Sequence, residues 1–163
     1  MKILVTFGSR YGSTRGIAER IAELLRADGH DVALTDARHA GDLAAYDGVV
    51  LGSGIYAGKL HADLAKLLAQ QHALAGKKVA AFAVSMSAAE DTPERRAEAD
   101  GYVKQITSQL DCTHATAFAG VHNPKALPLL VRWLLKAMKA PPGDFRDWAA
   151  IEAWADEIAA AWA

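Results

Sequence analysis

Cysteine is almost absent from this sequence: Cys112 is the single thiol among 163 residues, so no internal disulfide can form. It lacks the Cys and His spacing of a zinc site, and we expect an inert buried thiol and no metal. Neither charge is in excess, with 18 Lys and Arg against 19 Asp and Glu, so no overall field attracts nucleic acid. No apolar run reaches the roughly 20 residues of a spanning helix, and the N-terminal segment does not read as a signal peptide. We therefore expect a cytoplasmic protein that binds no nucleic acid.

Short β-branched apolar runs alternate with helical patterns, which is typical of a parallel sheet covered on both faces by helices. Apolar residues make up 52% of the chain, enough for one domain, residues 1–163, to bury a core without staples. The predicted strands are Ile3–Phe7, Asp31–Leu34, Gly48–Leu51, Lys78–Val84 and Ala115–Ala119. The predicted helices are Ser13–Ala27, Leu60–Leu74, Pro93–Leu110 and Trp148–Trp162, the last with Trp148, Ile151, Trp154, Ile158 and Trp162 on one face. This pattern predicts a doubly wound five-stranded α/β sheet whose ligands bind beyond the carboxyl ends of the strands.

The segment Gly8–Thr14 joins the first strand to the first helix and is rich in glycine and hydroxyl groups. Unpaired N–H groups and a partial positive charge at a helix N-terminus attract a phosphate. The candidate ligands there are Ser9, Arg10, Tyr11, Gly12, Ser13 and Thr14. Neither the Walker loop nor the GxGxxG fingerprint is present, which removes two other nucleotide-binding interpretations. The alternative is an ordinary turn in which Ser13 caps the helix.

This loop resembles that of the flavodoxins, Ser/Thr-x-Thr-Gly-x-Thr, at Ser9, Gly12 and Thr14, while Tyr11 departs from the pattern. The resemblance implies a flavodoxin-like sheet of strand order 2-1-3-4-5 that binds flavin mononucleotide (FMN). The chain is also similar to the menaquinone-dependent protoporphyrinogen IX dehydrogenases. That similarity includes Arg10 and the segments SRYGSTRGIAE, LGSGIYAGKLH and FAGVHNPKALPLLVRWLLKAMK. Between Met138 and Trp148, however, this chain is shorter than members of that family usually are. The similarity implies an oxidoreductase with a quinone or porphyrinogen-type partner.

Three further loops are expected to meet the flavin ring, given the flavodoxin-like resemblance. The loop after the third strand contributes Ser53, Gly54, Ile55, Tyr56 and Ala57, with Ile55 or Tyr56 as a wall of the ring site. The next two loops contribute Ser85, Met86 and Ser87, and then Gly120 and His122. His122 is the catalytic candidate, as a proton relay near neutral pH, and the alternative is a solvated histidine. His61 matches a histidine of the resembled dehydrogenases, with a local helix cap as the alternative.

The segment 127–139 combines large apolar residues with Arg132, Lys136 and Lys139. Such an amphipathic helix can touch membrane headgroups, and a comparable segment of the resembled dehydrogenases is thought to serve quinone or membrane access. The alternative, which we favour on spacing, is packing on the sheet through Leu130, Trp133, Leu134 and Met138, with the basic residues solvated.

We therefore expect an FMN-dependent oxidoreductase or electron-transfer protein whose partner is a redox protein or a small quinone-type acceptor. The near-neutral charge argues against a pure electron shuttle, which is usually strongly acidic. One alternative cofactor is an 8-hydroxy-5-deazaflavin, whose longer anionic tail would suit Arg10 and Arg15. Another alternative is a non-enzymatic module that keeps the fold and binds protein partners.

Overall fold

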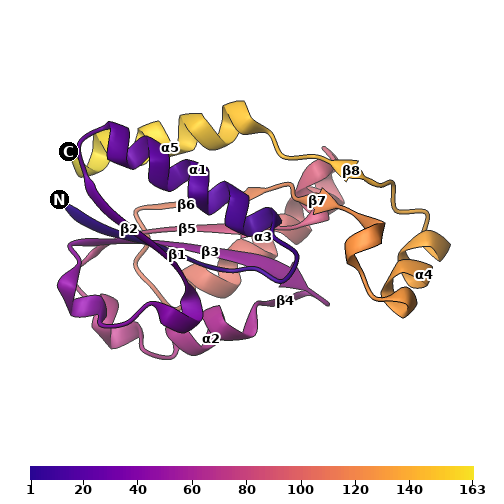
Figure 1. Ribbon diagram of the computed structural model, residues 1–163, viewed down its shortest axis with the longest axis horizontal. Coiled ribbons are helices and arrows are strands. Elements are labelled where there is room, and N and C mark those ends of the chain that lie inside the picture. The colour runs from indigo at the N-terminus through magenta and orange to yellow at the C-terminus, as the bar shows by residue number, and fades with distance from the viewer.

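A five-stranded parallel sheet organises the chain, and the computed structural model describes residues 1–163 (Figure 1). The strands are β1 (Lys2–Gly8), β2 (Asp31–Asp36), β3 (Gly48–Tyr56), β5 (Lys78–Val84) and β6 (His114–Phe118). They lie side by side in the order β2-β1-β3-β5-β6, all parallel. A short strand, β4 (Lys59–Leu60), pairs antiparallel with the end of β3. Apart from β4, this is the order 2-1-3-4-5, so the predicted topology is confirmed.

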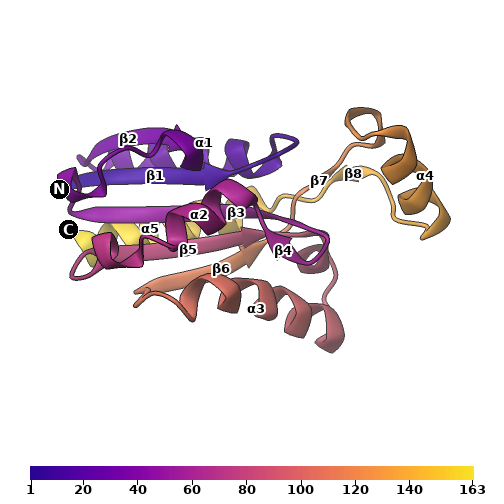
Figure 2. The same ribbon diagram turned by 90° about the horizontal axis from the view of Figure 1, so that it is seen from below.

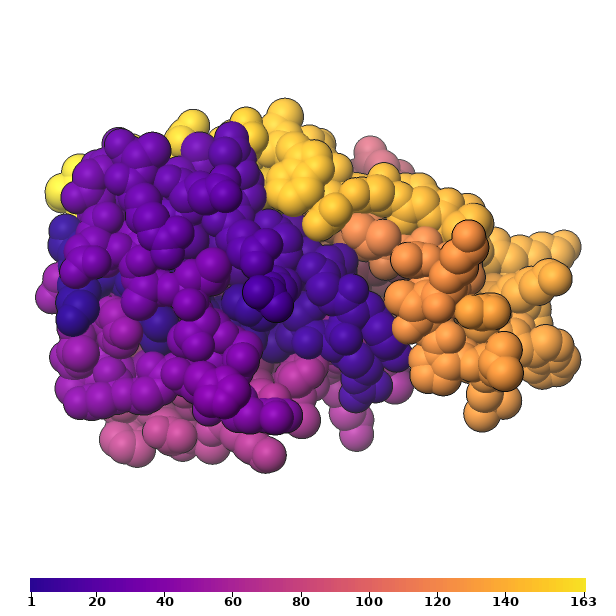
Figure 3. Space-filling view, in the orientation of Figure 1, coloured from indigo at the N-terminus to yellow at the C-terminus, as the bar shows by residue number.

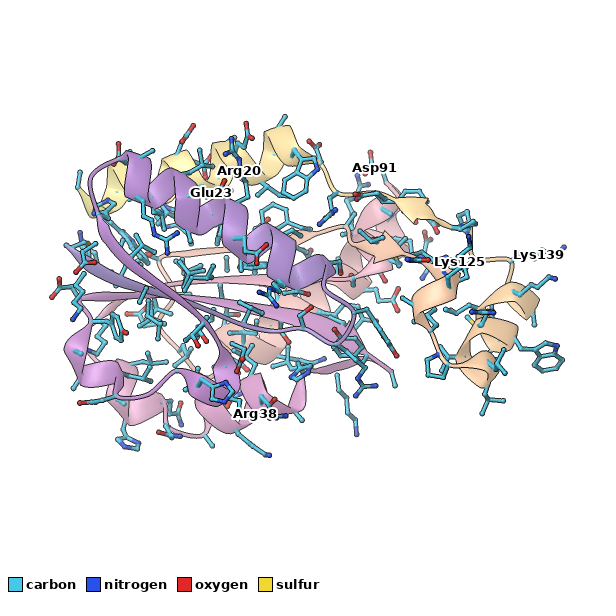
Figure 4. All side chains as sticks on the ribbon, in the orientation of Figure 1. Arg20, Glu23, Arg38, Asp91, Lys125 and Lys139 are labelled. Atoms are coloured by element: carbon cyan, nitrogen blue, oxygen red, sulfur yellow. The ribbon has the colours of Figure 1, made fainter.

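Helices cover both faces of the sheet (Figures 1 and 2). One face carries α1 (Ser13–Ala27) and α5 (Trp148–Trp162), and the other carries α2 (Ala62–Leu68) and α3 (Pro93–Thr107). The chain also forms five short 3-10 turns: η1 (Ala37–His39), η2 (Leu43–Ala45), η3 (Gln71–Leu74), η4 (Met86–Ala89) and η5 (Pro124–Ala126). Under α5, the rings of Phe82, Phe118 and Trp154 pack with centroids 5.7 to 5.9 Å apart. On the outer side, Arg20 of α1 (Figure 4) holds Glu152 of α5 at 2.7 Å.

The predicted boundaries of α1, β5 and α5 are confirmed, whereas several other elements differ. The second predicted helix is split into α2 and η3, α3 ends at Thr107, and β6 begins and ends one residue earlier than predicted. Thr92 caps α3, since its side chain accepts a hydrogen bond from the Arg95 amide. On α5, Trp148 is exposed and stacks on the Arg146 guanidinium at 4.7 Å, so its predicted place on the buried face is wrong.

The third strand is the largest departure from the sequence prediction, because β3 continues from Gly48 to Tyr56 and only residues 57–58 turn. The sequence predicts that this strand ends at Leu51 and that a loop follows. A Cβ on Gly52 would overlap the Phe82 ring, and one on Gly54 would lie 2.5 Å from the Tyr56 hydroxyl. These glycines therefore make room for aromatic side chains inside a paired strand, as glycines in strands often do.

An arm of residues 121–144 projects beyond the carboxyl ends of the strands (Figures 2 and 3). It consists of β7 (Val121–His122), η5, α4 (Leu129–Ala137) and β8 (Gly143–Asp144), with β7 and β8 paired antiparallel. No residue of α4 is buried, and Leu130 and Trp133 are 78% and 71% exposed. The expected packing of this segment on the sheet is therefore wrong. None of the helices is long and apolar enough to cross a membrane.

Candidate functional site

Four segments meet where the central strands end, as the parallel topology requires. The Arg10 amide of the first loop donates to the Tyr56 hydroxyl at the end of β3, at 2.7 Å. A Cβ on Gly120 would lie 3.3 Å from the Ser13 hydroxyl, so the chain after β6 lies against the first turn of α1. The Ser85 amide bonds the Phe118 carbonyl at 3.1 Å. All four predicted loops therefore lie at one edge of the sheet.

The first loop leaves the N-terminus of α1 open. Gly12 is the N-cap residue in a left-handed conformation with φ 93°, and no side chain caps the helix, so the alternative role of Ser13 as the cap is wrong. Instead the Ser9 hydroxyl accepts a hydrogen bond from the Gly12 amide at 3.1 Å. No acidic residue lies in the first turn. The first N–H groups of α1 therefore remain free to donate, and no charge compensates the helix dipole. Both features favour the binding of an anion at this N-terminus.

Three side chains near this edge have a buried polar atom with no partner: Thr14 Oγ1, Ser85 Oγ and His122 Nε2. Thr14 is fully buried in the first turn of α1. An unpaired buried polar atom costs free energy, so such atoms in a native fold call for an explanation. Because all three belong to the segments that follow β1, β5 and β6, they favour a polar ligand at this edge.

Tyr56 ends β3 and folds back over Gly54 toward the first loop. The Arg10 guanidinium lies 4.8 Å from the centroid of its ring, and Tyr11 and His61 meet the ring edge-on at 6.0 and 5.7 Å. Burial raises the pKa of the Tyr56 phenol, while hydrogen bonds from the Arg10 backbone and the Ser9 side chain act in the opposite direction. The phenol is therefore a neutral group at ordinary pH.

Not all of the other residues predicted to contact the flavin ring are free to meet a ligand. Ser53 is fully buried and internally satisfied, because it donates to the Gly54 carbonyl and accepts from the His61 amide. Ile55 pairs with Leu60 in the β3–β4 hairpin, and Ala57 occupies the turn with φ 49°. Ser53 thus positions the edge without being free to meet a ligand. The helix cap expected of His61 is confirmed, since its ring accepts from the Asp63 amide at 3.2 Å.

Helix α3 holds two of these loops, a role that the sequence gives no sign of. Glu98 accepts a hydrogen bond from the Ser87 hydroxyl at 2.7 Å, and that bond is the main cause that lowers the pKa of Glu98. Two turns further along the same face, Gln105 donates to the Gly58 carbonyl at 2.9 Å. Met86, the neighbour of Ser87 in the chain, is left exposed. Residues 98 and 105 lie two helical turns apart and so share a face, but only the packing of α3 beneath both loops gives that face this role, so no local motif could identify them.

His122 is buried in β7 and is not the solvated histidine of the alternative interpretation. Its Nδ1 lies 2.7 Å from the Pro141 carbonyl, and because a carbonyl only accepts, Nδ1 carries the proton. Nε2 has no partner. The observed contact ties the two ends of the arm together, so the histidine has a structural role whether or not it also relays protons.

A cavity of about 430 Å³ lies on the opposite, β2 side of the first loop. Ser9, Arg10 and Arg15 line it together with Thr35 and Asp36 at the end of β2. Arg15 is paired with Glu19 at 2.9 Å, so part of its charge is already neutralised. No three His, Cys, Asp or Glu side chains gather in a way that could hold a metal ion anywhere in the protein.

The fold and this edge define a class: a doubly wound α/β protein with an anion-seeking helix N-terminus at the switch between β1 and β3. Residues 4–147 match the family described as flavodoxin domain, and the chain belongs to that family. Among solved structures it is similar to a flavodoxin of Streptococcus pneumoniae TIGR4, with 18% identity, TM-score 0.63 and 99% of each chain covered. It is also similar to oxidised flavodoxin 2 of Bacillus cereus, with 26% identity, TM-score 0.56, and 74% of this chain and 85% of that chain covered. A third similar structure is an NADH:FMN oxidoreductase in its apo form, with 16% identity, TM-score 0.58, and 98% and 89% covered.

Proposed function

We propose that this protein binds FMN at the carboxyl edge of its sheet and works as a flavin-dependent electron-transfer protein or oxidoreductase. The observation that carries the proposal is the fully buried, unpartnered hydroxyl of Thr14 in the first turn of an uncapped helix. Family membership and the similar flavodoxin and FMN oxidoreductase structures support it. The residues present fit the phosphate of such a cofactor.

In this proposal the phosphate meets the amides of residues 10–14, the hydroxyls of Ser9, Ser13 and Thr14, and the charge of Arg10. Hydrogen bonds to a charged group are stronger than those between neutral groups, and the helix dipole adds to them. The bound flavin would supply the one- and two-electron chemistry. The chain would orient the ring between the end of β3 and the 85–87 loop, and α3 would fix both loops through Gln105 and Glu98.

Identification of the co-purifying small molecule by mass spectrometry and visible absorbance tests the proposal. We expect yellow protein that releases FMN on denaturation and rebinds it stoichiometrically. A bound 8-hydroxy-5-deazaflavin, with an absorbance maximum at shorter wavelength, would replace FMN in the proposal, and the Arg10 and Arg15 cavity would be the place for its anionic tail. Colourless protein whose melting temperature is unchanged by either cofactor would refute flavin binding and favour a partner-binding module.

The exposed arm favours an apolar acceptor, of the quinone type, met at an anionic lipid surface. Leu130, Trp133 and Leu134 of α4 face solvent, while Arg132, Lys136 and Lys139 recur at helical spacing. Figure 4 shows Lys125 and Lys139 on the arm, away from the sheet, and no Asp or Glu occurs between residues 123 and 143. An apolar face beside a wholly basic one is the pattern of an interfacial helix.

Co-sedimentation with vesicles of phosphatidylcholine, with and without phosphatidylglycerol, tests this docking. Binding should require the anionic lipid, and Lys136→Glu should weaken it at least fivefold, since one basic residue at such a surface is worth about 1 kcal/mol. Lys104→Glu on α3 makes the same charge change away from the arm and should have little effect. Equal losses in both variants, or no binding to either vesicle, would refute docking at a lipid surface.

Reduction of a quinone by the flavin-loaded protein, with a porphyrinogen as the donor, tests the substrate class.

A further inference from the structure

The hydroxyl of Tyr56 lies among the donors that the proposed function gives to a phosphate. It accepts the Arg10 amide hydrogen at 2.7 Å. A Cβ on Gly54 would come within 2.5 Å of this hydroxyl and 3.0 Å of Thr14 Oγ1, so both oxygens border the same small space. The absence of a side chain at residue 54 is what lets the phenol reach that far.

The tyrosine ring is held in this position by several weak contacts. The Arg10 guanidinium covers one face at 4.8 Å, and the edges of Tyr11 and His61 complete the surroundings. The Arg10 amide has one hydrogen and cannot serve the phenol and a phosphate oxygen equally. A phosphate seated on the loop and Tyr56 in its present position therefore compete for one donor.

We propose that Tyr56 determines specificity for phosphorylated flavins by making ring binding conditional on a phosphate in the loop. A dianion displaces the neutral phenol from the Arg10 amide because charge-assisted hydrogen bonds are about twice as strong as neutral ones and the helix dipole favours the anion. The released tyrosine ring then packs on the flavin. A flavin without phosphate cannot displace the phenol from the Arg10 amide. The Tyr56 ring then stays turned toward the first loop and does not form a wall of the flavin site.

This inference rests on the proposed flavin binding, and one set of titrations separates the two. Flavin fluorescence quenching on the full-length apoprotein gives the dissociation constants of FMN and riboflavin in chloride buffer and after addition of inorganic phosphate. We expect phosphate to tighten riboflavin binding, since it fills the loop and releases Tyr56. It should weaken FMN binding by direct competition.

The variant Tyr56→Phe keeps the ring and removes only the hydroxyl. Riboflavin should bind it about three- to tenfold more tightly than the wild type in chloride buffer, the range expected for one neutral hydrogen bond, and the enhancement by phosphate should shrink accordingly. Tyr46→Phe is the matched control, because Tyr46 lies before β3, at the other end of the sheet, where its ring covers Lys2. Its constants should equal those of the wild type.

The results of these titrations distinguish a failure of the Tyr56 role from a failure of the proposed function. If FMN binds but riboflavin affinity is unaffected by phosphate in the wild type, the role of Tyr56 is overturned and the cofactor proposal stands. That measurement needs no variant and so is independent of whether Tyr56→Phe folds. If neither flavin binds under any condition, the proposed function itself fails. A phosphate effect that is the same in wild type and Tyr56→Phe would also overturn the role of the hydroxyl.

Discussion

The replacement Thr14→Val should change stability and cofactor affinity in opposite directions. Valine has the shape of threonine and the same branched Cβ, so the packing in the first turn of α1 is kept. The lost hydroxyl is fully buried and has no partner without a ligand, and such an unsatisfied group costs about 1 to 3 kcal/mol. The free energy of unfolding of the apoprotein should therefore rise, by about 1 kcal/mol or more. A hydrogen bond to a charged phosphate is worth about 1.5 to 3 kcal/mol, so the FMN dissociation constant should rise about 10- to 150-fold.

Urea denaturation of the apoprotein and FMN titration measure the two effects separately. Thr6→Val is the matched control, since Thr6 is also fully buried with an unpartnered hydroxyl but lies inside β1, two residues before the loop begins. It should stabilise the apoprotein and leave FMN affinity unchanged. A Thr14→Val apoprotein that is less stable, with unaltered FMN affinity, would show that this hydroxyl serves the fold and would refute its role in holding phosphate.

Four further predictions concern the body of the protein. Trp154→Ala should lower the free energy of unfolding by about 3 to 5 kcal/mol, measured in urea, because it leaves a cavity against the rings of Phe82 and Phe118. Gly52→Ala should cost about 1 to 3 kcal/mol, seen as a lower melting temperature, because the added Cβ overlaps the Phe82 ring. Burial raises the pKa of Cys112 to about 11, so iodoacetamide labelling of the folded protein should be slow at pH 7 and accelerate about tenfold per pH unit up to about pH 10. Because this pKa lies above the ordinary 9.0, unfolding releases a proton and stability should fall as the pH rises from about 9 to 11.

The sequence predicts the sheet well because the pattern that identifies it is local. Each strand is a short β-branched run, each main helix has an apolar stripe, and the right-handed crossover restricts how they can be connected. The extent of β3 could not be predicted in this way. Gly52 and Gly54 are ordinary turn signals, and only the positions of Phe82 and Tyr56 in three dimensions show that they serve to make space. A glycine required by a distant neighbour looks the same in sequence as one required by a turn.

The candidate site shows the same division. The loop 9–14 and the loops after β5 and β6 were predictable, because topology alone brings the ends of neighbouring strands together. Glu98 and Gln105 were not, since they act from the face of a helix more than ten residues from the loops they hold. The inward fold of Tyr56 was also beyond prediction, because it depends on the missing side chain at residue 54 and on the Arg10 amide.

Helix α4 shows where periodicity is informative and where it is not. Its apolar and basic stripes were correctly identified as an amphipathic helix, but such a pattern gives only the apolar face and not what covers that face. Packing on the sheet was the wrong choice. Both faces of the sheet are already covered by the other four helices, and the β7–β8 pair carries α4 beyond them.

Most of the unpartnered buried polar atoms and the exposed apolar surface of α4 lie at one end of the protein. Of the five buried polar atoms without a partner, those of Thr14, Ser85 and His122 belong to the segments at the carboxyl edge of the sheet or the base of the arm. The unpartnered apolar surface of α4 extends from that same end. An unpaired buried group costs free energy, and an exposed apolar patch marks an interaction surface, so both call for an explanation. Their occurrence together favours one functional site, in which a polar ligand binds at the carboxyl edge of the sheet and an apolar partner contacts α4.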